Sequence, residues 1–199
     1  MKNSIKTAAL LVAIMGASFA VKAQTTSGTT PASNSGSNGV IISVGAESGI
    51  SVGDFRDAHK WSIGGTVQAD IPVVNQLYAN INTGYLNYFG KDNVFGTGLR
   101  ATDIHTLPVM AGLKLFPVKY FYIQADAGAA FALNKSDLGY DKTAAFLYVP
   151  QVGVQLPVGG KNYIDAGVLY NGSTKFSSTD ETSKINSIAL RVAYAFGTK

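Results

Sequence analysis

Two histidines are the side chains of this chain that could act as general bases near neutral pH. His59 lies in the segment Asp57-Ala58-His59-Lys60, and His105 lies two residues after Asp103. An imidazole beside a carboxylate could take a proton from a substrate, but no nucleophile stands at a defined spacing from either histidine. We therefore interpret both as residues at the rim of a sheet, assign no catalytic residue and expect no enzyme activity.

The sequence patterns that could indicate a metal site or a nucleotide site are equally weak. Asp54, Asp57 and His59 are close in sequence, but their spacing does not form a closed metal site. The segment 96–101 fits a dinucleotide-binding fingerprint, yet no helical pattern follows it. The chain of 199 residues has no cysteine, which excludes cysteine-ligated metals and a lipoprotein anchor. We expect no cofactor and no metal.

Six charged residues fall on the polar face of segments in which apolar and polar residues alternate. Leaving a buried charge without a partner costs roughly 3–5 kcal/mol, so these residues should pair with one another if that face is enclosed. We expect Arg191 to reach Asp165 or Glu47, and Asp126 and Lys114 to lie in adjacent strands, offset along the axis. The charged set is Glu47, Asp70, Lys114, Asp126, Asp165 and Arg191, and the amides that fill in between are Gln68, Asn80, Asn82, Gln124, Gln151 and Gln155.

The elements that position these residues are strands. Eight segments rich in Val, Ile, Tyr and Ala alternate with period two and are separated by turn residues. Each has about the length of a tilted membrane-crossing strand, ~9–11 residues plus rims. The segments are 40–53, 61–71, 77–89, 104–116, 120–133, 144–156, 162–170 and 185–196. An even number of strands places both termini at the same, periplasmic end of such a barrel.

The connections between these segments alternate in length. Ile71-Pro72-Val73, Phe116-Pro117-Val118 and Leu156-Pro157-Val158 each lead within a few residues to a tyrosine, repeating every 40–45 residues. Proline gives no N–H to a ladder, so we expect it to mark strand ends here. The other connections are longer and polar: 54–60, 90–103, 134–143 and 171–184. Short turns at the periplasmic end and long loops at the outer end are typical of barrels that span the outer membrane.

The N-terminal residues have the pattern of an export signal. Lys2 and Lys6 precede an apolar run from Ala8 to Ala20, which is too short to cross a bilayer as a helix. We expect residues 1–23 to be removed before Gln24, residues 24–38 to form a Ser/Thr/Gly/Asn-rich tether, and residues 39–199 to form the barrel. Removing the signal leaves 13 basic residues against 12 acidic ones, which argues against nucleic acid as a partner.

Bulky apolar residues gather on one face of each strand. In the last segment Leu190 and Val192 alternate with Arg191 and small residues. A water-soluble barrel needs many charges on its outer face, and the polar face here has about one charge per strand. We therefore expect the apolar face to meet lipid. Two aromatic belts are predicted: Tyr78, Phe116, Tyr120, Tyr122, Tyr163, Tyr194 and Phe196 near the short turns, and Phe55, Trp61, Tyr85, Tyr88, Phe89, Tyr148 and Tyr170 near the long loops.

Four phrases, HTLPVMAGLKLF, FYIQADAGAAF, YVPQVGVQLP and IALRVAYAF, carry a family resemblance over residues 40–199. They resemble the outer-membrane β-barrel domain family, whose members are similar in plan to the OmpA and OmpX barrels. The resemblance implies the bacterial outer membrane, its lipid, and the export and barrel-insertion machinery as partners. It also implies that Val192, Tyr194 and Phe196 form the insertion signal. The tail Gly197-Thr198-Lys199 departs from this pattern, since such chains often stop at the aromatic residue.

The resulting prediction is an all-β protein, an eight-stranded antiparallel up-and-down transmembrane β-barrel of porin-like plan. We expect a monomeric, non-enzymatic membrane protein with a structural or surface-interaction role through four extracellular loops, and a lumen plugged by a polar network. The loops carry balanced charge, so no basic patch is expected. A lipid A-modifying barrel enzyme, a narrow channel and a soluble ligand-binding barrel are the alternatives left open.

Overall fold

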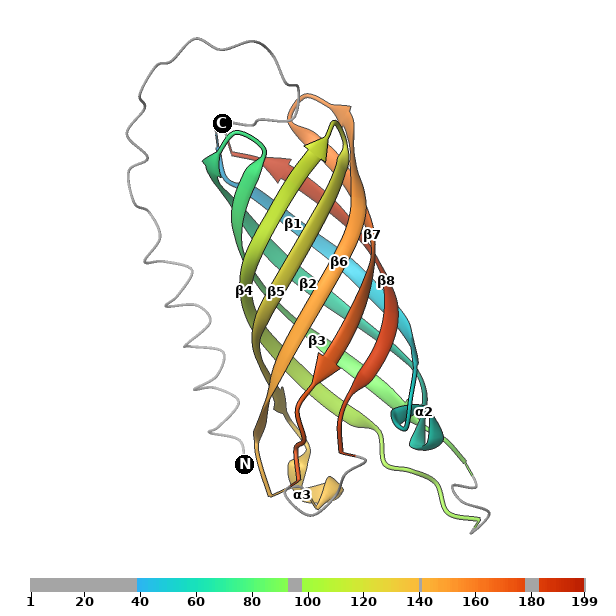
Figure 1. Ribbon diagram of the computed structural model, residues 1–199. Helices are drawn as coiled ribbons and strands as arrows, with labels where there is room; N and C mark the ends of the chain where they lie inside the picture. The colour runs from blue at the N-terminus through green and yellow to red at the C-terminus, as the bar shows by residue number, and fades with distance from the viewer. Residues whose placement is uncertain (1–38, 93–97, 140, 178–182, 199) are drawn as a thin grey trace. The chain divides into compact units, whose positions relative to one another are not determined.

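The part of the chain that the structure describes forms a closed barrel of eight antiparallel strands (Figure 1). The computed structural model describes residues 39–92, 98–139, 141–177 and 183–198. Neighbouring strands in sequence pair with each other, and the last strand pairs with the first. The strands are β1 (Ile41–Ser51), β2 (His59–Val74), β3 (Leu77–Gly90), β4 (Ile104–Val118), β5 (Phe121–Ala132), β6 (Ala144–Gly159), β7 (Asn162–Ser173) and β8 (Asn186–Gly197). The predicted fold class is confirmed, while the expected signal and tether lie outside the described residues.

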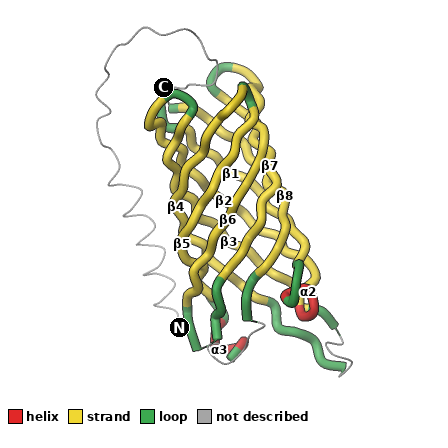
Figure 2. The backbone as a smooth tube through the Cα atoms, in the orientation of Figure 1, coloured by secondary structure: helices red, strands yellow, loops and turns green. Residues whose placement is uncertain are grey.

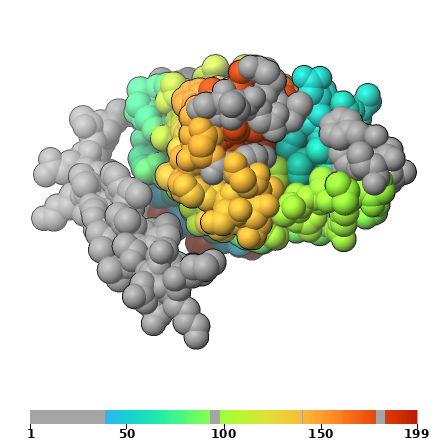
Figure 3. Space-filling view, turned by 90° about the horizontal axis from the view of Figure 1, so that it is seen from below, coloured from blue at the N-terminus to red at the C-terminus, as the bar shows by residue number. Residues whose placement is uncertain are grey.

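The two ends of the barrel differ as the connection lengths predict. The turns joining β2 to β3, β4 to β5 and β6 to β7 lie at one end, which we call the short-turn end (Figure 1). The other end, the long-loop end, holds two four-residue helices, α2 (Phe55–Ala58) and α3 (Lys135–Leu138) (Figure 2). Seen from the long-loop end, segments from several loops crowd together (Figure 3). No helix among the described residues is long and apolar enough to cross a membrane.

The three repeated prolines lie one or two residues before the ends of their strands, so each of these strands ends slightly later than expected. Pro72, Pro117 and Pro157 belong to β2, β4 and β6, which run on for one or two residues more. The strand register shifts at each of them, between Pro72 and Val74, between Leu115 and Val118, and between Pro157 and Gly159. An irregular pair of this kind tolerates a residue without an N–H, so the strand continues past the proline.

The alternation along each strand separates two faces. Bulky apolar side chains point outward, and Leu190 is 62% exposed. The neighbouring Arg191 is only 1% exposed because it points into the lumen. The same holds for Leu113 and Ile123, which are exposed, and for Gln124 and Asp126, which are buried. An outward apolar face around a polar lumen is the inverse of a water-soluble barrel and suits a lipid environment.

The interior is divided along the barrel axis. The half near the long loops is packed with apolar side chains, which include Leu86, Ile104, Met110, Leu147, Leu169, Phe176 and Ile185. The half near the short turns holds the buried ion pairs of Lys114 and Arg191 and, beyond them, a cluster of aromatic rings. The expected small and polar residues are therefore present in both halves, since Ser62, Asn171 and Ser187 are buried near the long loops. In that half they share the lumen with medium-sized apolar residues, which the sequence analysis did not expect there.

The prediction of two aromatic belts is partly wrong, because several of these rings lie inside the barrel. The rings of Tyr78, Phe116, Tyr122, Phe55 and Tyr88 are buried inside. Four of these rings are on strands, where each lies two positions from another residue that faces the lumen. Phe55 lies on α2 rather than on a strand. The outward rings that remain exposed include Tyr194 and Phe196 at the short-turn end and Trp61, Tyr85 and Tyr148 at the long-loop end. A reduced belt thus borders the apolar band at each end.

Candidate functional site: a charge network inside the barrel

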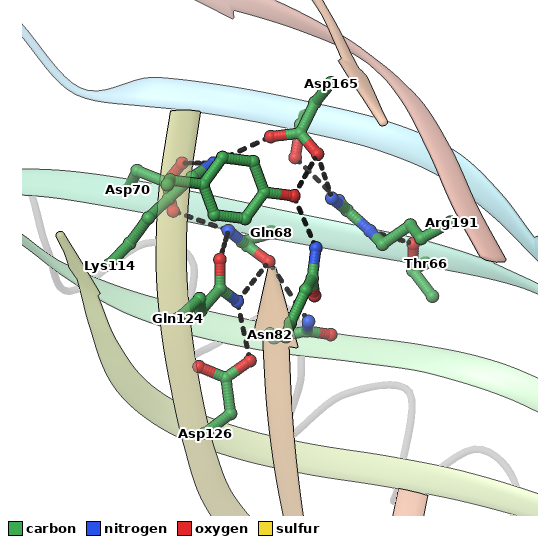
Figure 4. Close-up of polar contacts among 12 residues, drawn as sticks. Thr66, Gln68, Asp70, Asn82, Lys114, Gln124, Asp126, Asp165 and Arg191 are labelled. Carbon is green, nitrogen blue, oxygen red and sulfur yellow. Dashed lines mark hydrogen bonds and ion pairs between the residues drawn. The ribbon is translucent and has the colours of Figure 1, made fainter. Parts of the chain in front are cut away.

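The structure brings the central charged residues together inside the lumen (Figure 4). We call this set the Lys114 network. It takes one residue from each of five strands: Asp70 on β2, Lys114 on β4, Tyr122 on β5, Asp165 on β7 and Arg191 on β8. Each occupies an inward position of its strand, so the period-two pattern alone delivers all five to the same enclosed space.

Lys114 and Asp165 form the centre of the network. The Lys114 Nζ lies 3.1 Å from Asp70 Oδ2 and 2.7 Å from Asp165 Oδ2. The other oxygen of Asp165 accepts hydrogen bonds from the Tyr122 hydroxyl at 2.7 Å and from Arg191 Nη1 at 3.3 Å. One carboxylate thus joins two cations and a phenol. The bonds from Lys114 and Tyr122 connect strands that are not neighbours in the sheet, while Asp165 and Arg191 lie on the adjacent strands β7 and β8. The cross-lumen bonds fix the wall of the barrel from inside.

Arg191 uses all three of its nitrogens. Besides Asp165, its Nε donates to Thr66 Oγ1 at 3.0 Å and its Nη2 donates to Ser43 Oγ at 2.8 Å. The sequence left Asp165 and Glu47 as possible partners, and the structure places the ion pair with Asp165. Glu47 lies opposite Arg191 in the β1–β8 register but instead accepts a hydrogen bond from Asn171 Nδ2 at 2.8 Å.

A ladder of amides continues from the charged centre. Gln68 Nε2 donates to Asp70 Oδ1 at 2.6 Å, and Gln124 Nε2 donates to Asp126 Oδ2 at 2.7 Å. Gln68 and Gln124 also bond to each other across the lumen at 3.3 and 3.2 Å. Asp126 and Lys114 lie in adjacent strands, as expected, but Lys114 pairs with other acids. Asp126 therefore depends on an amide rather than on a cation.

These contacts account for the excess of acids over bases among the six buried charges. Two cations, Lys114 and Arg191, are paired with Asp70 and Asp165. The two remaining carboxylates, Glu47 and Asp126, accept hydrogen bonds from amide groups. The sequence analysis did not assign four further polar contributors to the lumen, although each follows the inward alternation of its strand: Ser43, Thr66, Tyr122 and Asn171.

Aromatic rings close the lumen on the short-turn side of the charges. We call Tyr78, Phe116 and Tyr122 the aromatic seal. Their ring centroids are 5.7 Å apart for Tyr78 and Phe116 and 5.8 Å apart for Phe116 and Tyr122. The Lys114 Nζ lies 4.2 Å from the centroid of the Tyr122 ring, a cation–π distance. Gly153 makes room for this ring, because a Cβ there would lie 2.6 Å from the ring and 2.6 Å from the Ala166 carbonyl oxygen.

Both histidines lie at the long-loop end and have local partners. His59 Nε2 lies 3.2 Å from the Thr102 carbonyl oxygen, and its ring stacks on Phe55 at 4.4 Å. His105 Nδ1 lies 2.7 Å from the Tyr85 hydroxyl. Within the described part of the chain, no three His, Asp or Glu residues are placed to hold a metal. Of the segment 96–101, which the sequence analysis interpreted as a loop, residues 96 and 97 lie outside the described residues.

The proposed insertion signal lies on the outer face of β8. Val192, Tyr194 and Phe196 all point outward. The tail after the aromatic residue joins the sheet: Gly197 N donates to the Lys161 carbonyl and Thr198 N to the Val40 carbonyl, each at 2.9 Å. These bonds extend the pairing of β8 with both of its neighbours, so the two residues help to close the barrel seam.

No family model and no curated protein matches this chain. Among solved structures, the chain is similar to the outer membrane protein AlkL in DMPC lipid bilayers, with 16% identity, a TM-score of 0.50, and coverage of 87% of this chain and 97% of that one. It is also similar to the outer membrane protein OprG from Pseudomonas aeruginosa, with 10% identity, a TM-score of 0.51, and coverage of 80% and 95%. The fold is that of the small eight-stranded outer-membrane barrels. The apolar outer face is the surface that such a fold presents to lipid.

Proposed function

We propose that this integral outer-membrane barrel is a closed, non-conducting and non-enzymatic scaffold that holds its four long loops at the cell surface. The observation that carries the proposal is the Lys114 network, which bonds side chains from β2, β4, β5, β7 and β8 across the lumen. Eight strands enclose only enough space for their own side chains. Filled in this way, the interior supports the wall and leaves no continuous path for solutes.

The charged half of the lumen opposes ion passage because its charges are already bonded to one another. An ion that entered would have to separate Lys114 from Asp70 or Asp165, and breaking a buried pair costs roughly 3–5 kcal/mol. The aromatic seal adds a second obstruction toward the short turns.

The apolar half opposes ion passage for a different reason. Its apolar inward side chains, which include Met110, Leu147 and Leu169, offer no hydrogen bonds to replace the water around an ion. An ion would therefore meet a dehydrating segment and a charge-paired segment in series. Because both segments oppose ion passage, we favour a closed scaffold over a narrow channel.

Planar-bilayer recording tests the proposal. The full chain, folded in detergent and verified by its shifted mobility on an unheated gel, is expected to give no stepwise conductance in concentrated KCl. Heat-denatured protein serves as the blank, and an open porin recorded in the same bilayers shows that the assay detects a pore. Reproducible steps from the folded protein alone would overturn the proposal.

The non-enzymatic part rests on the histidines, whose observed contacts are with Thr102, Phe55 and Tyr85. Cells producing the wild type, His59→Ala or His105→Ala are expected to have the same lipid A profile as cells without the protein. A lipid A species that appears with the wild type and disappears with either variant would favour the enzyme instead.

A further inference from the structure

A groove of about 650 Å³ lies at the long-loop end, on the side of the barrel formed by β6, β7 and β8. Three lysines line it, Lys142, Lys175 and Lys184, together with Tyr148 and Tyr170. No acidic residue is among its described lining residues. Balanced loop charges predicted no basic patch, but that expectation considered each loop alone, whereas the fold gathers lysines from two different loops.

Backbone hydrogen bonds hold these two loops together beside the groove. Lys142 N donates to the Phe176 carbonyl at 3.1 Å, and Thr174 N donates to the Phe146 carbonyl at 2.8 Å. Ser173 N donates to the Ile185 carbonyl at 2.9 Å, next to Lys184. The positions of the lysine backbones are therefore set by the sheet and its extensions.

Two tyrosines line the groove together with the lysines. The rings of Tyr148 and Tyr170 lie 6.1 Å apart on the outward side of β6 and β7, and the Tyr170 hydroxyl donates to Asn186 Oδ1 at 3.1 Å. The apolar outer face begins immediately below, with Val168 and Ile188 exposed. Neither Lys142 nor Lys184 is ion-paired with any residue that the structure describes.

We propose that this groove binds the phosphate group of an outer-leaflet lipid, with the lysines around the phosphate and the tyrosines against the part of the lipid that joins phosphate to acyl chains. The inference rests on the proposed membrane position, with the long loops outward. Lysine is a common phosphate ligand, and a cationic site directly above a lipid-facing surface meets phosphate at the depth where headgroups lie. Tyrosine suits that depth because its hydroxyl group can stay hydrated while the rest of its ring contacts apolar groups.

Native mass spectrometry of the full chain released from detergent micelles tests the site. The probes are a short-chain phosphatidic acid, the matching phosphatidylcholine and inorganic phosphate. Phosphatidic acid is expected to remain bound at lower concentrations than either of the others. The triple variant Lys142→Gln, Lys175→Gln, Lys184→Gln is expected to bind it on the order of a hundredfold more weakly, since each lysine near a lipid surface contributes about 1 kcal/mol and about 1.4 kcal/mol is a factor of ten.

A matched control separates a site from general surface charge. The variant Lys60→Gln, Lys91→Gln, Lys135→Gln removes the same charge from other parts of the long-loop end and is expected to bind phosphatidic acid like the wild type. Equal weakening in both triple variants would overturn the proposal. The unheated-gel mobility of each variant shows that the barrel is intact.

The Tyr148→Ala variant distinguishes the source of the phosphate. For a lipid, this change is expected to weaken phosphatidic acid binding while inorganic phosphate binding stays the same. If inorganic phosphate competes equally with phosphatidic acid and Tyr148→Ala changes neither, the groove takes a free phosphate and the lipid proposal fails. Bilayer conductance is a separate measurement, so a negative result here leaves the closed scaffold untouched.

Discussion

At the scale of single residues, Lys114 is the side chain on which most of the interior depends. It is 1% exposed and bonds two carboxylates from strands on different sides of the lumen. Its ammonium also lies over the ring of Tyr122, which itself donates to Asp165. Removing this one cation would leave two buried carboxylates short of a partner, and that loss is larger than the energy of any single hydrogen bond.

Lys114→Met tests this dependence. The variant keeps most of the side-chain volume but leaves Asp70 without its cation, so we expect the free energy of unfolding to fall by roughly 3–5 kcal/mol. Urea unfolding in lipid vesicles, followed by gel mobility without heating, measures the change. The control is Lys60→Met, since Lys60 is 50% exposed and pairs with Asp92 at 3.4 Å, a surface pair worth about 1 kcal/mol or less. Equal losses in the two variants would show that the network carries no special stability.

At the scale of strands, the alternation of residue types predicts well which side chains face the lumen, but it predicts poorly which of them contact one another. In β5 it places Gln124 and Asp126 inside and Ile123 outside, because every second residue faces the same way. It does not show that Lys114 meets Asp70, since strand tilt and side-chain reach decide which inward residues lie at one level. The prediction of Tyr122 as a belt residue failed because its residue type was weighed above its position in the alternation.

Two other features of the strands were beyond the sequence pattern. The division of the lumen into an apolar and a charged half depends on how far each inward residue lies from the turns, which requires the register of all eight strands. The register shifts at Pro72 and Pro157 likewise come from pairing with a neighbour. Residue types on one strand do not specify that pairing.

The outward face of β8 gives a direct test of lipid contact. Leu190 is exposed in the middle of the strand, and an arginine on a lipid-facing strand near the bilayer midplane costs about 2–4 kcal/mol. Leu190→Arg should therefore reduce the free energy of unfolding in vesicles by that amount. Leu99→Arg is the control, because Leu99 is 70% exposed but lies in a loop, where surface changes stay within about 0.5 kcal/mol. A stable Leu190→Arg protein would mean that this face is not in hydrocarbon.

At the scale of the whole molecule, closure and membrane position are connected. Pairing of β8 with β1 leaves no free strand edge among the eight strands, which a lipid environment requires. Gly197 and Thr198 add bonds at the seam beyond the last aromatic residue. We propose that the barrel-insertion machinery reads Val192, Tyr194 and Phe196 before this seam closes, and that the closed barrel then stays monomeric.

The single tryptophan reports where the barrel sits in the membrane. Trp61 lies on the outer face at the long-loop end and stacks on Phe89 at 4.4 Å. If the apolar band spans the hydrocarbon, this ring lies at the headgroup boundary. In vesicles, lipids brominated near the headgroup should therefore quench its fluorescence more than lipids brominated near the end of the acyl chain.

The control replaces Trp61 by Phe and introduces Phe55→Trp, which moves the indole to a buried position inside the same end of the barrel. That indole should escape both quenchers because the wall and the loops separate it from lipid. Equal quenching at the two positions would mean that the interior is open to lipid, and stronger quenching of Trp61 from the acyl end would place the long loops within the bilayer.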